Sequence, residues 1–118
     1  MGTKAFFSVE TKPGFHCTTI IGMTWDGTPN NLEYIAQCFE DKMKKLRKKT
    51  VVLRGNTNAI IQVLESVVVD HEDWLFIDEI KNVQWISHSA LYSPKKGILR
   101  LYEGQLEDFD KDIIIKKK

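Results

Sequence analysis

The spacing of apolar residues predicts one long helix in the first half of the chain. Six apolar residues recur at three- and four-residue intervals, which places them in one stripe: Leu32, Ile35, Ala36, Phe39, Met43 and Leu46. Thr28 suits the N-cap position, and Pro29 suits the first helical position, where its missing N–H does no harm. Lysine and arginine fill the final turns, where cations stabilise the negative end of the helix dipole. We therefore predict a helix over about 29–48.

Short runs rich in β-branched and aromatic residues predict strands on both sides of this helix. Before it, residues 5–10 and 15–24 flank the turn Lys12-Pro13-Gly14 and read as a hairpin or two successive strands. After it, turn signals separate further predicted strands at 50–54, 74–77, 81–92, 97–102 and 112–116.

Residues 59–69 fit two different periods. One face of a helix would hold Ile60, Ile61, Leu64, Val67 and Val68, whereas the alternation of a strand fits Ile61, Val63, Val67 and Val69. The many β-branched residues favour the strand. A helix at this point would instead make the middle of the chain an ordinary α/β sandwich.

These elements predict an α+β fold in a single domain covering 1–118, since 118 residues suffice for one core but not for two. Consecutive antiparallel strands of this length usually close into a small barrel, because an open sheet leaves long unpaired edges. The predicted architecture is therefore a small, mostly antiparallel β-barrel or pseudobarrel, completed by the one long amphipathic helix.

Two resemblances point to RNA. Residues 50–94 resemble an Sm-like barrel: a helix precedes a strand, a bent apolar strand ends in Asp70, and Ser87-His88-Ser89 stands where bacterial Sm-like proteins have a short His-containing segment. The whole-chain layout resembles the PUA-like pseudobarrels, and its size is similar to the PrgU-type regulators of Gram-positive conjugative plasmids. Both resemblances imply an RNA-binding regulator, of plasmid or phage origin.

Composition and charge bear on the location of the protein and on its class of partner. The net charge is +1, so there is no global field to attract nucleic acid or a membrane, and any electrostatic contact must come from local clusters. Cys17 and Cys38 are too few for a secreted disulfide scaffold. The chain shows no signal peptide, and its apolar runs are shorter than a membrane span. We therefore expect a cytoplasmic protein without a membrane partner.

Clustered cations form the main candidate site. Six of them lie within eight residues at the end of the predicted helix: Lys42, Lys44, Lys45, Arg47, Lys48 and Lys49. They predict a surface that neutralises RNA phosphates, and the alternative is a solvated helix end. Four further cations would join this surface if the fold placed them on the same side: Arg54, Lys95, Lys96 and Arg100.

Aromatic residues add candidates for base stacking. Trp74 is expected in the core, whereas Trp85 and Tyr92 stand in polar sequence and would stack unpaired bases if they were exposed beside the cations.

Catalytic and metal chemistry have weaker support. Asp70-His71-Glu72-Asp73 lacks calcium-loop spacing and is interpreted as a polar turn. Cys17 and Cys38 lack zinc spacing, and we predict no cofactor, no metal and no enzyme activity. The leading hypothesis is a non-catalytic RNA-binding module. The alternative is a protein-binding module or small inhibitor, supported if exposed apolar strand residues or an unpaired edge are found. The oligomeric state stays open, with a homo-oligomer as one option.

Overall fold

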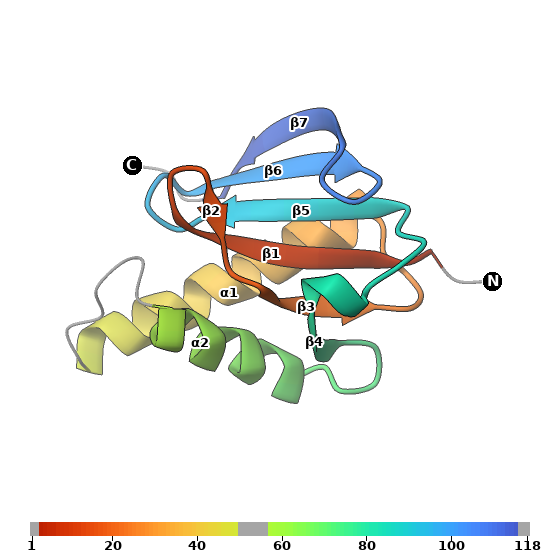
Figure 1. Cartoon of the computed structure of the whole chain (residues 1–118). Helices are drawn as coiled ribbons and strands as arrows, with labels where there is room; N and C mark the ends of the chain where they lie inside the picture. The colour runs from red at the N-terminus through yellow and green to blue at the C-terminus, as the bar shows by residue number, and fades with distance from the viewer. Residues whose placement is uncertain (1–2, 50–56, 116–118) are drawn as a thin grey trace.

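The computed structural model describes residues 3–49 and 57–115, and the side chains of 46–49 lie outside the described part. The elements follow in the order β1 (Ala5–Lys12), β2 (Phe15–His16), β3 (Thr19–Met23), α1 (Pro29–Lys49), α2 (Thr57–Val69), β4 (Phe76–Glu79), the 3-10 turn η1 (Ile80–Asn82), β5 (His88–Ser93), β6 (Ile98–Glu103) and β7 (Asp108–Ile114). The fold is α+β, with two helices beside a seven-stranded, mostly antiparallel sheet (Figure 1).

The sheet is open. Its strand order is β4-β3-β1-β5-β6-β7, with β2 paired to β1, so that β4 and β7 form the two edges. The barrel expected from the strand pattern is therefore not closed among the described residues. The physical reason is the parallel pairing of β1 with β5, which needs a long crossover. The segment between β3 and β4 carries both helices, and they cover one face of the sheet (Figure 1).

Helix α1 matches its prediction closely. The Thr28 hydroxyl accepts a hydrogen bond from the Asn31 amide at 3.4 Å, and the Thr28 carbonyl accepts one from the Leu32 amide at 3.0 Å. Pro29 is the first helical residue. Five residues of the predicted stripe are fully buried against the sheet: Leu32, Ile35, Ala36, Phe39 and Met43. The sixth, Leu46, lies outside the described side chains.

The strand favoured for residues 59–69 is wrong, because this run forms helix α2. Its buried residues are Ile60, Val63, Leu64 and Val67, and these positions share one helical face. Val69, which the strand pattern would have placed with them, is exposed. Burial of an apolar face on β3 and β4 therefore outweighs the modest strand preference of β-branched residues. The bent strand on which the Sm-like resemblance rests is accordingly a helix.

Several strand boundaries also differ from those expected. The strand predicted at 81–92 begins only at His88, because η1 and a loop occupy the residues before it. The last strand begins at Asp108 rather than at residue 112, so that Asp108, Asp110 and Asp112 belong to β7. Residues 50–54, predicted as a strand, lie outside the described residues.

Candidate nucleic-acid interface

The C-terminal half of α1 carries part of the predicted cationic surface. Lys44 and Lys45 are exposed. Lys42 is engaged elsewhere: its ammonium group lies 2.6 Å from the Asp70 carboxylate at the end of α2. The hydrogen bond from Lys42 is the main reason why the pKa of Asp70 lies below its usual range. The side chains of Arg47, Lys48 and Lys49, and the whole of Arg54, lie outside the described part.

The turn between β5 and β6 supplies two more of the predicted cations. Lys95 and Lys96 are exposed, and Gly97 closes the turn with a left-handed φ of 71° and an amide that donates to the Ser93 carbonyl at 2.7 Å. Figure 1 places this turn at the same end of the sheet as the C-terminal end of α1. Two segments about fifty residues apart in sequence thus present lysines at one end of the molecule.

Arg100 lies near Lys96 but not near the lysines of α1. It lies on the sheet face opposite the helices, because its neighbours Leu99 and Leu101 point into the core. Its guanidinium donates two hydrogen bonds to Asp112, at 3.0 and 3.3 Å, and this carboxylate raises the pKa of Arg100. Arg100, Asp112, Glu10 and Lys96 line a shallow pocket of about 110 Å³. The carboxylates in this pocket already balance the cations, which makes it a poor phosphate site.

The two stacking candidates are separated by the fold. Tyr92 is fully buried and packs on Phe7 and Phe39, with ring centroids 6.2 and 5.7 Å away. The prediction that Tyr92 stacks on bases is therefore wrong, since its position in β5 faces the helices. Trp85 is 86% exposed, in the loop before β5. That loop lies at the opposite end of the sheet from the end of α1 (Figure 1).

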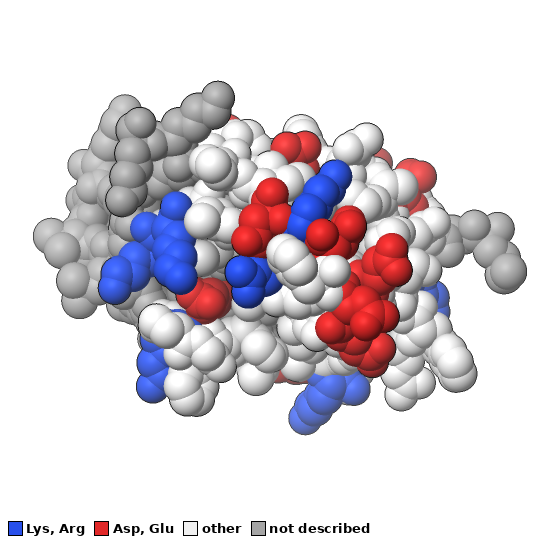
Figure 2. Space-filling model, turned by 90° about the horizontal axis from the view of Figure 1, so that it is seen from above, with Lys and Arg blue, Asp and Glu red and all other residues white. Residues whose placement is uncertain are grey.

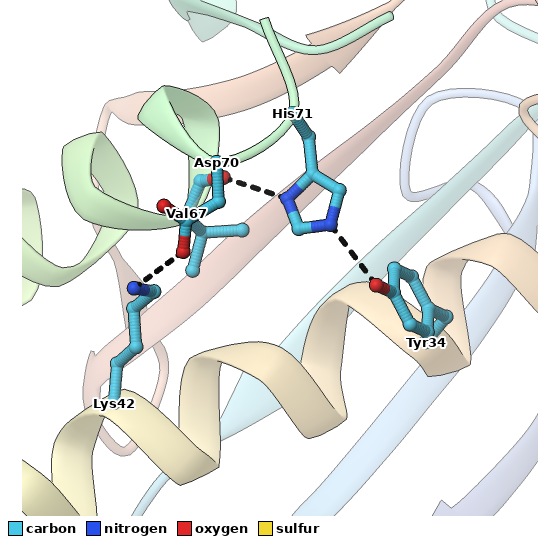
Figure 3. A network of polar contacts seen from close by, with 5 residues as sticks. All are labelled: Tyr34, Lys42, Val67, Asp70 and His71. Atoms are coloured by element: carbon cyan, nitrogen blue, oxygen red, sulfur yellow. Dashed lines mark hydrogen bonds and ion pairs between the residues drawn. The ribbon is translucent and has the colours of Figure 1, made fainter.

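Asp70-His71 forms a clasp between the helices that the sequence pattern does not reveal (Figure 3). The Val67 carbonyl can only accept, so His71 Nδ1 donates to it at 2.9 Å, and His71 Nε2 is hydrogen-bonded to the Tyr34 hydroxyl at 3.0 Å. Contact with Cys38 raises the pKa of Tyr34, and burial raises the pKa of the Cys38 thiol. Both His71 nitrogens are used within the clasp, which indicates a structural role.

Charge is unevenly distributed over the surface. Figure 2 looks onto the β6–β7 side, where most carboxylates lie towards the end at which β6 turns into β7, away from the end of α1. Within 3–49 and 57–115, no three His, Cys, Asp or Glu side chains converge to hold a metal ion. No helix in the same ranges is both long and apolar enough to span a membrane.

Comparisons of the chain with protein-family models, with curated proteins and with solved structures found no match. The functional argument therefore rests on the geometry described above.

Proposed function

We propose that the protein is a non-catalytic RNA-binding module whose contact surface is the lysine-rich end, defined here as Lys44 and Lys45 of α1 together with Lys95 and Lys96 of the β5–β6 turn. The observation that carries the proposal is the gathering of these exposed cations from distant parts of the chain at one end of the sheet. Such a surface neutralises phosphates without reading the base sequence.

The regulator of plasmid or phage origin implied by the PUA-like, PrgU-type layout belongs to the same proposal. The open sheet with helices on one face supports a pseudobarrel only in the general sense of a small, strand-rich fold. A cytoplasmic location is part of the proposal, because RNA is encountered there.

Charge reversal tests the proposal. Lys44→Glu/Lys45→Glu should weaken binding of a single-stranded 20-nucleotide RNA, and the salt dependence should fall by about 0.7 in slope for each phosphate that the protein no longer neutralises. The matched control is Lys4→Glu/Lys81→Glu, which makes the same charge change at two exposed residues outside the lysine-rich end. Equal affinity of the two variants would refute the assignment of this surface.

A second candidate function, protein binding, has its own support. Trp85 is 86% exposed and adopts a left-handed φ of 60°, an uncommon conformation for a tryptophan. Phe109 and Ile114 of β7 are exposed by 56% and 65%. Exposed aromatic and apolar residues of this kind are typical of protein-binding surfaces. Trp85 and Phe109 lie away from the lysine-rich end, whereas Ile114 pairs with Ile98 and so borders the β5–β6 turn.

A further inference from the structure

Strand β7 offers an open edge for a further strand. Among the described residues it pairs on one side only, with β6. Every residue from Asp108 to Asp112 is exposed, and only Ile113 is half-buried. Its outer backbone groups are therefore accessible to another extended segment, which could bind them by continuing the antiparallel ladder.

The other edge of the sheet is less suited to this role. Strand β4 has four residues, against seven in β7, and none of the four is more than marginally exposed: Ile77, the most exposed, reaches 36%. Short edge strands are a common way to prevent unwanted pairing. The fold protects β4 in this way and leaves β7 long.

The two exposed apolar residues of β7 lie on one face, whereas Ile113 points to the core on the other. Phe109 and Ile114 are opposite Tyr102 and Ile98, on the sheet face away from the helices. Phe109 packs edge-on against Tyr102, with centroids 6.2 Å apart, and the Arg100 guanidinium lies 5.1 Å from its centroid. Phe109 is thus held in place while 56% of it remains exposed, as expected of an anchor for a partner side chain.

The charges of β7 indicate what the partner carries. The strand has three carboxylates, Asp108, Asp110 and Asp112, and one lysine, Lys111. Opposite charges across an antiparallel pair are stabilising and like charges are destabilising. Charge complementarity therefore favours a segment with lysine or arginine and disfavours an acidic one.

The same charges disfavour a second copy of this chain. A twofold axis that pairs β7 with itself over its full length is centred on Lys111, which would then face its own copy. Asp110 would face Asp112 in the same register. Both pairs bring like charges together and would repel.

We propose that β7 binds an extended segment of another protein, in which basic residues alternate with apolar ones, as an added outer strand. The apolar side chains pack on Phe109 and Ile114, and the basic ones lie on the other face of the added strand, beside Asp108 and its neighbour Glu103. This inference rests on the second candidate function, protein binding, and is independent of RNA binding.

An octapeptide of alternating lysine and valine, blocked at both ends, is the probe. It should bind the full chain and slow amide hydrogen exchange along β7 but not along β4. The same peptide with every backbone nitrogen methylated should not bind, because it keeps the charge but has no N–H group on either edge to extend the ladder. Asp108→Lys/Asp110→Lys should weaken binding at least tenfold. The control Glu65→Lys/Glu72→Lys makes the same charge change at two exposed helix and turn residues and should bind normally.

Four results would overturn the proposal. Equal binding of the methylated peptide would mean attraction by charge alone. Protection of residues 83–87 in place of β7 would leave protein binding standing but move the site to the Trp85 loop, whereas protection nowhere would remove protein binding of this peptide class altogether. A dimer of the unliganded chain that Phe109→Ser dissociates would identify a second copy as the occupant.

Discussion

Substituting Ser89 by alanine tests how the β6–β7 turn is held in place. Ser89 is fully buried in β5, and its hydroxyl donates to the Gly104 carbonyl at 2.6 Å and accepts from the Leu106 amide at 2.7 Å. Leu106 has a left-handed φ of 54°, which is costly for a leucine. One hydroxyl therefore fixes a strained turn onto the sheet.

The magnitude follows from the two bonds. Ser89→Ala leaves the Leu106 amide and the Gly104 carbonyl with only their longer bond to each other, at 3.2 Å, and a polar group that loses its partner costs about 1–3 kcal/mol if it stays away from water. Gly104 and Leu106 are half-buried, so water reaches them in part and the lower end of this range applies. We expect a loss of about 2 kcal/mol in the free energy of unfolding, which lowers Tm by roughly 6–10 °C in a domain of this size.

Urea unfolding, followed by circular dichroism, measures this loss. Ser8→Ala is the matched control, because Ser8 is equally buried but its hydroxyl lies 3.5 Å from its acceptor, the Cys17 carbonyl, at the limit of a hydrogen bond. It should cost less than about 1 kcal/mol. If the two variants unfold at the same urea concentration, the turn does not depend on the Ser89 bonds and the reasoning fails.

Two further predictions concern packing and pH. A Cβ on Gly22 would lie 2.6 Å from the Phe76 ring, so Gly22→Ala should destabilise the protein by about 1–3 kcal/mol, and Phe76→Leu in the same chain should recover part of that loss in a double-mutant cycle. Additive losses would show that the ring does not determine the cost. Because Lys42 lowers the pKa of Asp70, their pair stabilises the fold above the ordinary pKa of 3.8, and this contribution disappears as the pH falls through the lower folded-state pKa. Asp70→Asn should therefore unfold more easily than the parent at neutral pH and equally at strongly acidic pH; a difference that persists in acid would contradict the ion-pair origin.

Helix α1 is predictable because its signals are local. The Thr28 cap, the proline after it and the apolar stripe all lie within one segment and all favour a helix. Tertiary contacts favour the same structure, so they do not change the prediction. Helix α2 is not predictable, since its apolar residues fit both a helical face and strand alternation, and their β-branched side chains favour the strand. The helical structure of α2 is determined by its packing on β3 and β4, the latter of which follows it in the chain. The burial of Ile60, Val63 and Val67 on one face is a property of the assembled fold.

The candidate site also has a part that the local sequence predicts and a part that depends on the fold. The lysine run is visible as a local cluster, but its relation to the β5–β6 turn depends on topology. Tyr92 is misjudged from sequence because the polar neighbours Ser89 and Ser93 suggest exposure, yet both serines are buried as well. The β7 edge could not be foreseen, because the open sheet follows from the parallel β1–β5 pair. No sequence signal in or near β1 or β5 predicts that these two strands pair in parallel.

The lysines near the end of α1 also contribute to the stability of the fold, and the RNA-binding experiment has to be interpreted with this in mind. A cation in the last turn of a helix contributes about 0.3–1 kcal/mol at an exposed site and its reversal costs about twice that, but Lys44 and Lys45 precede the last turn of α1, where the effect is weaker. Lys44→Glu/Lys45→Glu should therefore destabilise the fold by about 2 kcal/mol at most, against a typical total of about 5–15 kcal/mol. More than nine-tenths of the molecules would remain folded even at the lower end of that range, so unfolding alone would reduce RNA affinity by less than a tenth. A tenfold fall in the affinity of this variant would then have to come from weaker neutralisation of phosphates or from charge repulsion at the lysine-rich end.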